Sequence, residues 1–471
     1  MKVLTVILLV CGFLSTLTVS DYYIFNRFGE FFKSFIISQW VKKCAYVLFP
    51  MAVFLNRRSA ADVAKYFLPI FIVISALLYG DFFSVTMMTE DASAATMIYA
   101  GINEFIPQWG VRALFYIENG IMAILCVCLF IRDGYRIYPR SFIMAPVTMI
   151  LVMPLNIFEN FYDASSIPAD SFLNFGSFTL WHFLAVVFLA GLTIGLYYLL
   201  RHASTKDKWD ALRYISLVMV LQYCSRNSML MGDGYNVYNT IFTALPLYIC
   251  NIGVFIALIS VFTKNRVFLS MSFFVHAAGA LSMFVYFGRP EMSNYGIFCS
   301  YTTTYLVVTH AWLFAVCVLP TALGLYKWRP KDAIIPIIYY FVFIVLATVV
   351  SGVITSYSMT LSYNGIYLTE DELIVPNYSF TQIDPLPIYN PPNIPFTIWK
   401  YEFNLFYLIF LFIDYIIIFY AFNGCYHIFL KCHTRFIHRK GTFMNPAPDA
   451  PEDEIPEDTA EIFTEDTENT A

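Results

Sequence analysis

The amino-acid sequence predicts an all-α, polytopic helical membrane protein with about 12 transmembrane helices, arranged as two parallel six-helix repeats. Hydrophobic residues make up 59% of its 471 positions, and charged residues make up only 13%. Apolar runs of about 18 or more residues are long enough to cross a bilayer as helices. Because these runs show no alternating strand pattern, helices are the expected spanning form, since they satisfy their own backbone hydrogen bonds in lipid.

Twelve apolar runs are predicted to span the membrane. In the first half these are residues 3–20, 38–56, 64–84, 111–131, 141–160 and 178–200. In the second half they are residues 209–231, 242–262, 267–288, 301–323, 333–358 and 397–422. The run 38–56 is the weakest, because Lys42 and Lys43 interrupt it. The run 3–20 is interpreted as a retained anchor rather than a signal peptide, because no clear cleavage motif of small residues follows it.

The distribution of Lys and Arg predicts the orientation of these spans. Basic residues gather after every second run, whereas the loops between are mostly poor in them, and two of those loops are acidic (90–91 and 370–372). By the positive-inside rule, both termini are expected to be cytoplasmic, in a multi-pass protein of the cell membrane. The first loop is an exception, since it carries Arg27 and Lys33.

The expected organisation has four parts. Residues 1–204 form the first six-helix repeat, and residues 205–430 form the second. A basic juxtamembrane segment, 431–444, then leads into an acidic tail, 445–471, which is rich in Pro, Asp, Glu and Thr. With almost no large apolar residues, this tail is predicted to be disordered and cytoplasmic.

Paired motifs in the two halves suggest an internal duplication. The sequence 178–181 (FTLW) opens the sixth run, and 396–399 (FTIW) opens the twelfth. Proline-containing basic loops at 135–140 and 326–331 also correspond, and Cys44 and Cys250 each lie early in the second run of their half. An even number of spans per half keeps both halves in the same orientation, as in some transporters. Chance recurrence of aromatic loop residues is the alternative explanation.

Cys250 and His310 are the candidate catalytic residues. Each lies eight or nine residues from the outer end of its run, which corresponds to a depth of about 12–13 Å in a helix. A neutral imidazole beside a thiol can accept its proton and generate a nucleophilic thiolate. Taken singly, a membrane cysteine is more often a small apolar filler, whereas a membrane histidine is more often paired or functional.

Residues from about Leu212 to Leu430 resemble the YwaF-type integral membrane family. Four stretches carry the resemblance: 245–250 (LPLYIC), 276–281 (HAAGAL), 309–311 (THA), and 396–399 (FTIW) with Glu402 behind it. Eukaryotic relatives of this family are described as phospholipid acyltransferases that depend on a membrane cysteine. The resemblance therefore implies Cys250 as the nucleophile and His310 as its base.

The sequence departs from the family pattern at two places. Tyr248 stands where the family typically has a histidine. In the first half, Asn119 aligns with His310, and an amide cannot take up a proton as an imidazole can. The first half is therefore expected to have lost its chemistry and to act as a scaffold or as part of a lipid groove.

Other polar residues within the runs are candidate substrate contacts: Arg226, Tyr248, His276 and Glu402. Arg226 could bind a phosphate or headgroup or snorkel to the interface. His276 could line the same cavity or be a packed, hydrogen-bonded histidine. Glu402 is expected about five residues into the last span, where it could orient a histidine or pair with Arg226. Glu118, in the first half, could stay protonated or pair with Arg112.

Three classes of function remain open at this point. One is a lipid acyltransferase or lipid hydrolase that uses Cys250 near the outer leaflet. Another is a secondary transporter whose halves move about a central site, and the third is a non-catalytic membrane scaffold or sensor. No nucleotide-binding loop, zinc-protease helix or nucleic-acid motif occurs, so membrane lipids are the expected partners, and no cofactor, metal, nucleotide or nucleic acid is predicted.

Overall fold

The computed structural model describes residues 1–18, 33–87, 108–136, 138–153, 172, 178–232, 245–285, 301–360, 362–363, 366–367, 379, 381 and 392–439. The chain forms two compact units, Met1–Phe419 and Tyr420–Ala471. The described part of the second unit is the C-terminal part of helix α16 (Leu405–Arg439).

The helices before residue 153 form a closely packed group. They are α1 (Lys2–Thr18), α3 (Lys33–Val53), α4 (Arg58–Met87), α6 (Gln108–Asp133) and, after the 3₁₀ turn η2 (Pro139–Ile143), α7 (Met144–Leu151). Helix α3 packs along α4, and both α1 and α4 pack against α6. Their common core includes the fully buried Ala45, Ala60 and Ala64. Such small residues let membrane helices approach closely.

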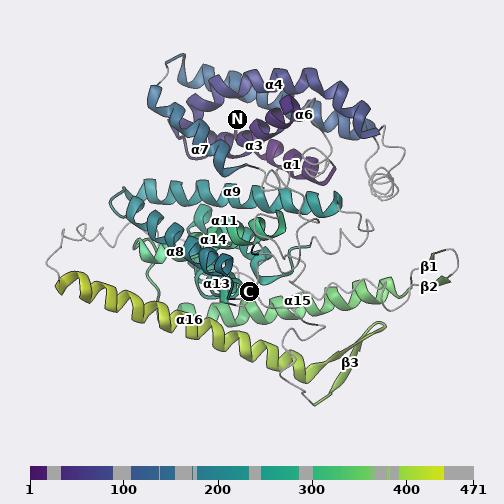
Figure 1. Ribbon diagram of the computed structural model, residues 1–471, viewed down its shortest axis with the longest axis vertical. Helices are drawn as coiled ribbons and strands as arrows, with labels where there is room; N and C mark the ends of the chain where they lie inside the picture. Colours follow the sequence, from purple (N-terminus) through teal and green to yellow (C-terminus); the bar gives the residue numbers. More distant parts are fainter. Residues whose placement is uncertain are drawn as a thin grey trace, which may run out of the picture. The chain divides into compact units, whose positions relative to one another are not determined.

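The helices after residue 178 form the rest of the first unit together with the beginning of α16. They are α8 (Leu180–Leu200), α9 (Thr205–Gly232), α11 (Ile249–Thr263), α12 (Arg266–Met271), α13 (Ala277–Val285), α14 (Tyr301–Ala322) and, after the 3₁₀ turn η7 (Pro330–Ala333), α15 (Ile334–Ser358). A π-helical turn, η5 (Ser272–His276), connects α12 to α13. Helix α9 contacts α1 and α3 as well as α11 and α14, so it joins the two groups of helices (Figure 1).

Each of the predicted apolar runs overlaps one of these helices. Among the described residues, six helical stretches are long and apolar enough to cross a membrane: Ala113–Asp133, Leu180–Leu200, Arg266–Phe284, Thr304–Ala322, Lys331–Tyr357 and Leu405–Phe429. The prediction of a helical, multi-pass membrane protein is therefore confirmed. The arrangement as twelve spans in two repeats stays a prediction.

The last predicted run began too early, because residues 395–404 form a β-hairpin rather than the start of a helix. Strand β3 (Pro395–Ile398) pairs antiparallel with β4 (Tyr401–Asn404), and Phe396 lies opposite Phe403 with their rings stacked. A shorter strand pair, β1 (Ser362–Tyr363) with β2 (Ile366–Tyr367), lies in the preceding loop. Glu402 consequently lies at an exposed position of β4, outside the helix in which it was expected.

Contacts with α15 and with the following helix explain why the hairpin forms. The Ser356 hydroxyl accepts hydrogen bonds from the backbone N–H groups of Lys400 and Tyr401 at 3.0 and 3.1 Å. It also donates to the carbonyl of Ile398 at 2.9 Å. The Asn404 side chain then accepts from the backbone N–H of Phe406 at 3.0 Å and so caps α16. A polar capping residue of this kind marks a helix start.

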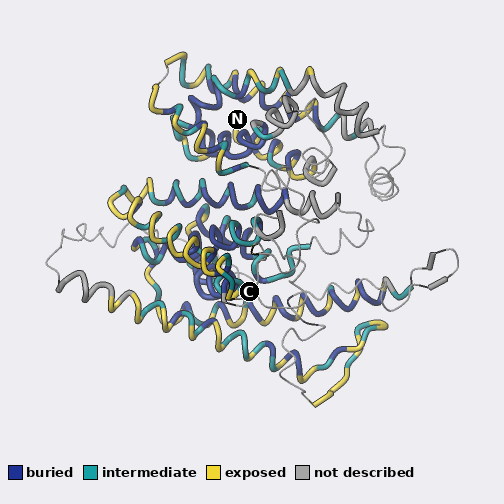
Figure 2. Tube along the Cα trace, in the orientation of Figure 1, coloured by how far each residue is buried: buried dark blue, intermediate teal, exposed yellow. Residues whose placement is uncertain are grey.

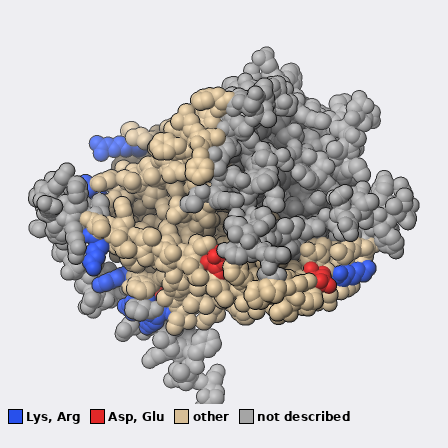
Figure 3. All heavy atoms as spheres, turned by 60° about the horizontal axis from the view of Figure 1, so that its bottom comes forward, with Lys and Arg blue, Asp and Glu red and all other residues tan. Residues whose placement is uncertain are grey.

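Burial and charge are distributed as expected for a protein in lipid. Helix α8 exposes most of its apolar residues, whereas α14 and the stretch α12–α13 bury most of theirs (Figure 2). On the face drawn in Figure 3, most of the described surface is uncharged; most of the Lys and Arg lie toward the left, and a basic side chain at the right lies beside an acidic one. The orientation of the termini stays a prediction.

Candidate functional site

Cys250 lies in the first turn of helix α11, which begins at Ile249, whereas the predicted run begins at 242. Cys250 is therefore the second residue of its helix and does not lie eight or nine residues into it, as predicted. Tyr248, the residue before the helix, is extended with φ −92° and ψ 146°. The first N–H groups of a helix lack intrahelical partners, and the helix dipole is positive there. The half-buried Cys250 thiol therefore lies beside backbone groups that stabilise negative charge.

The segment that leads into Cys250 is held against α15. Leu245, Leu247 and Tyr248 pack on the α15 residues Ala347 and Ile354. The Ser379 hydroxyl, from the loop between α15 and α16, donates to the carbonyl of Leu247 at 2.9 Å. Tyr248, a predicted substrate contact, thus takes part in the packing that fixes the start of α11.

His276 lies directly beneath the first turn of α11. Its ring has no exposed surface, and Nδ1 lies 2.9 Å from the carbonyl oxygen of Ile249. Because a carbonyl can only accept, Nδ1 carries the hydrogen, and Nε2 then accepts from the Tyr339 hydroxyl at 3.1 Å. Of the two sequence interpretations, the packed, hydrogen-bonded histidine agrees with this geometry.

His310 lies in the middle of α14 and is buried. Its Nδ1 lies 2.7 Å from the carbonyl oxygen of Leu306, one helical turn earlier. The same reasoning assigns the ring hydrogen to Nδ1, which leaves Nε2 as the nitrogen with the basic lone pair in the neutral imidazole. Since Nε2 is also the nitrogen farther from the backbone, His310 has the tautomer that a general base needs.

Helices α11 and α14 pack against each other, so the helices that carry Cys250 and His310 are neighbours. This neighbourhood is a requirement of the sequence hypothesis, and the direct pairing of the two side chains stays a prediction. Arg226 lies in α9, but its side chain falls outside the described residues. Glu402 lies exposed on β4, whereas His276 and Tyr248 lie at the start of α11.

The first half contains a buried charged cluster that sequence reasoning missed. The Lys42 ammonium group forms an ion pair with Glu118, whose other carboxylate oxygen accepts from the Tyr46 hydroxyl at 2.9 Å. Glu118 has no exposed surface, and Lys42 is 7% exposed. From the sequence, Arg112 was the candidate partner of Glu118, and Lys42 was only a charge that weakened the predicted span 38–56. Two ions of opposite sign in separate spans were the available signal, because charges within a membrane usually pair.

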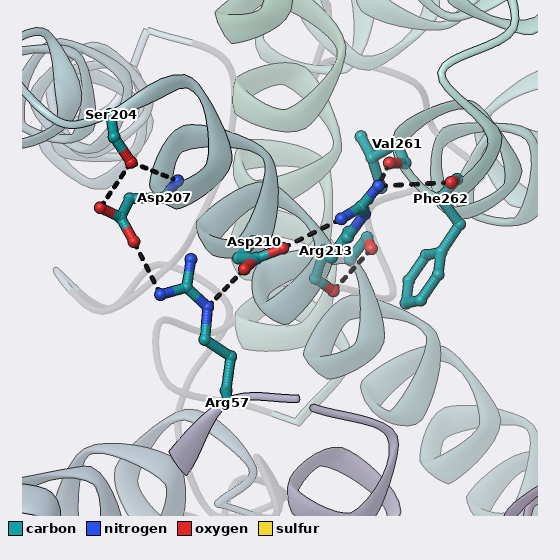
Figure 4. A network of polar contacts seen from close by, with 8 residues as sticks. Arg57, Ser204, Asp207, Asp210, Arg213, Val261 and Phe262 are labelled. Atoms are coloured by element: carbon teal, nitrogen blue, oxygen red, sulfur yellow. Dashed lines mark hydrogen bonds and ion pairs between the residues drawn. The ribbon is translucent and has the colours of Figure 1, made fainter. Parts of the chain in front are cut away.

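A second polar network joins the first half to the other end of α11 (Figure 4). Arg57, between α3 and α4, forms ion pairs with Asp207 and Asp210 at the start of α9. Asp210 also pairs with Arg213 at 2.9 Å. Arg213 in turn donates to the carbonyl of Val261 at 2.9 Å, near the C-terminal end of α11. Helix α11 is therefore held at both ends, by His276 at its start and by Arg213 at its end.

Metal-binding geometry is not found in the part of the chain that the structure describes, because no group of three or more His, Cys, Asp or Glu side chains is suitably placed there.

A family model described as the TMEM164 family matches residues 177–420. This range covers just over half of the chain and includes Cys250, His276 and His310. Neither a curated protein nor a solved structure matches the chain.

Proposed function

The chain belongs to the TMEM164 family of membrane proteins, and on this premise we propose that it transfers or hydrolyses the acyl group of a membrane lipid, with Cys250 as nucleophile and His310 as base. The observation that carries the proposal is the place of Cys250 in the first turn of α11, a helix that packs against the helix of His310. A helix N-terminus favours the thiolate, which is the reactive form of cysteine.

In the proposed reaction, Nε2 of His310 takes the thiol proton, and the sulfur attacks the carbonyl carbon of an acyl ester. Backbone N–H groups in the first turn of α11 stabilise the oxyanion that forms. The C–O bond then breaks, and the departing alkoxide receives the proton from His310, leaving a thioester on Cys250. An acceptor hydroxyl or a water molecule next attacks the thioester while His310 takes its proton, and His310 finally returns this proton to the thiolate.

The proposal includes the predicted duplication, with a first half that has no catalytic site of its own. The packing supports it: α3 packs on α4 as α11 packs on α12, and α4 packs on α6 as α13 packs on α14. The contacts of α1 with α3 and α6 likewise correspond to those of α9 with α11 and α14. In this alignment, the buried Lys42–Glu118 pair joins α3 to α6, the counterparts of the helices that carry Cys250 and His310.

The test compares Cys250→Ala with Cys44→Ala, a substitution at the corresponding cysteine of the first half. Protein purified in lipid would be incubated with a phospholipid that carries a tagged acyl chain. The wild type and Cys44→Ala should form a hydroxylamine-labile adduct on the Cys250 peptide and transfer the acyl chain to a lysolipid. Cys250→Ala should form no adduct there and should lose about 10³-fold or more of its turnover.

Full acyl transfer by Cys250→Ala would reject the enzymatic proposal. Uptake of a solute into proteoliposomes that survives this substitution, without acyl transfer by the wild type, would support the transporter instead.

A further inference from the structure

We propose that His276 is a positioning residue for Cys250, which holds the first turn of α11 through the carbonyl of Ile249 and so sets the direction of the neighbouring thiol and amide. This inference rests on the proposed function. It assigns His276 no contact with substrate, because the imidazole is entirely buried.

The path of contacts runs from α15 to the nucleophile. The Tyr339 hydroxyl donates to Nε2 of His276, and the two rings meet edge to face with centroids 5.5 Å apart. Nδ1–H of His276 then donates to the carbonyl oxygen of Ile249, the residue immediately before Cys250. Both nitrogens therefore have fixed partners, which suits a group that orients its neighbours rather than one that exchanges a proton in each reaction cycle.

The backbone is shaped to allow this contact. His276 ends the π-helical turn η5, and π-turns within α-helices occur frequently at functional sites. Gly253 faces the imidazole so closely that an added Cβ would lie 2.7 Å from Nδ1 and 2.9 Å from Cγ. At Gly279, an added Cβ would lie 2.8 Å from Cγ2 of Ile249. Two glycines thus permit α11 and the η5–α13 segment to meet around this histidine.

The hydrogen bond to Ile249 acts on the peptide group that links Ile249 to Cys250. Because the carbonyl oxygen and the Cys250 N–H belong to one planar unit, fixing the carbonyl also fixes the direction of that N–H. A hydrogen bond to the carbonyl also polarises the peptide and strengthens its N–H as a donor. In the proposed reaction this N–H is one of the groups that stabilise the oxyanion, so His276 influences both the attacking sulfur and the oxyanion site.

The experiment uses the full-length protein in lipid and measures two quantities. One is the rate at which N-ethylmaleimide alkylates Cys250, followed by mass spectrometry of its peptide, and the other is kcat and KM for acyl transfer. His276→Leu, which removes both hydrogen bonds of the imidazole at similar volume, should lower kcat about 10- to 100-fold, as loss of a residue that orients a catalytic group commonly does, while KM changes little. The alkylation rate of Cys250 should change in the same variant. Tyr339→Phe, which removes only one hydroxyl, should give a smaller change of the same kind.

His182→Leu is the matched control. His182 is also buried and bridges two helices, with Nε2 2.6 Å from the carbonyl oxygen of Phe284, which belongs to α13 and not to α11. It should leave kcat and the alkylation of Cys250 near the wild-type values. Equal effects of His182→Leu and His276→Leu on both quantities would overturn the inference, since general loosening of the fold would then explain them.

A second pair of variants tests the contact without relying on one substitution. Gly253→Ala places a methyl group against the imidazole and should slow acyl transfer, whereas the same change in a His276→Ala background meets no imidazole and should have little further effect. Additive effects would overturn the inference. If the wild type transfers no acyl group, the proposed function fails, and the alkylation rates still decide whether His276 positions Cys250.

Discussion

Helices α3 and α6 in the first half and helices α11 and α14 in the second half contain polar residues of different chemical kinds. The first pair buries an ammonium group and a carboxylate, Lys42 and Glu118, which bind each other. The second pair carries a thiol and an imidazole, which are neutral in their ordinary forms and can exchange a proton. In the proposed duplication these are corresponding helices, so the two halves would use corresponding positions for different purposes.

A buried ion pair stabilises the fold but is poorly suited to catalysis. Each ion of the pair satisfies the other, and Tyr46 takes up a further carboxylate position at 2.9 Å. Removing one ion would leave the other without compensation in a region of low dielectric constant, which is strongly unfavourable. A pair that must remain intact for stability is poorly suited to proton transfer. This difference fits the proposed function, in which the first half is a scaffold and the second half holds the reactive site.

The largest effect is expected when one partner of the ion pair is removed. Lys42→Met leaves Glu118 buried without its counter-ion, and the free energy of unfolding should fall by about 3–5 kcal/mol. The double substitution Lys42→Met with Glu118→Gln removes both charges and keeps an acceptor for Tyr46. It should recover most of the loss. The free energy of unfolding of both variants is measured by circular dichroism as the concentration of a denaturing detergent is raised.

Equal stability of the single and double variants would contradict this explanation of the first half. It would mean that the ion pair between Lys42 and Glu118 contributes little to the free energy of unfolding. Stability would then not distinguish this pair from Cys250 and His310.

The halves also differ where their last helices begin, although both places carry the motif FTxW. In the first half, the Thr179 hydroxyl accepts from the backbone N–H of His182 at 3.3 Å and caps α8, with Trp181 inside the helix. In the second half, the same motif forms strand β3, and Trp399 lies at the hairpin turn with φ 54°. Nearly identical local sequence thus adopts two structures, because only the second copy meets Ser356 and Gly352 of α15.

A substitution at the docking point of the hairpin should have the next largest effect. A Cβ added at Gly352 would lie 2.8 Å from the Phe403 ring and 2.9 Å from Cβ of Ile398. Overpacking of this kind usually costs about 1–3 kcal/mol, so Gly352→Ala should detach the hairpin from α15. Limited proteolysis should then cut within 395–404 faster than in the wild type. Gly191→Ala in α8, where an added Cβ meets nothing within 4 Å, is the control that should not change the rate. Unchanged cleavage in Gly352→Ala would indicate that α15 does not hold the hairpin.

The sequence was sufficient to predict a helix within each apolar run, because a hydrophobic run identifies a candidate span independently of its neighbours. The pairing of Lys42 with Glu118 could not be predicted from the sequence. The unfavourable free energy of burying each charge is evident from its own run, but its partner depends on which helices become adjacent. The link from His276 to Ile249 was equally hidden, because it depends on a π-turn and on two glycines in separate helices. For Cys250, its place in the first turn of a helix, and not eight residues into one, follows from the packing of Leu247 on α15 and could not be read from the apolar run.

The smallest effect is expected for the exposed contact between the halves. Arg57→Ala removes the ion pairs to Asp207 and Asp210, and because Arg57 is partly exposed the loss should be about 1 kcal/mol or less. Arg58→Ala makes the same change in charge without touching either aspartate and is the control. A double-mutant cycle of Arg57→Ala with Asp207→Ala isolates the interaction energy of the pair.

This interaction should also depend on pH in a direction that can be derived. The hydrogen bond from Ser204 and, next, that from Arg57 lower the pKa of Asp207 below its ordinary value of 3.8. The unfolded chain therefore binds this proton more readily than the folded protein, so the stabilisation is complete above pH 3.8 and disappears as the pH falls through the folded-state pKa. Interaction energies measured with the cycle should be constant near neutral pH and should decline only below that value. A decline that begins near pH 6 would point to a histidine instead, and would mean that the halves are joined by a contact other than the one between Arg57 and Asp207.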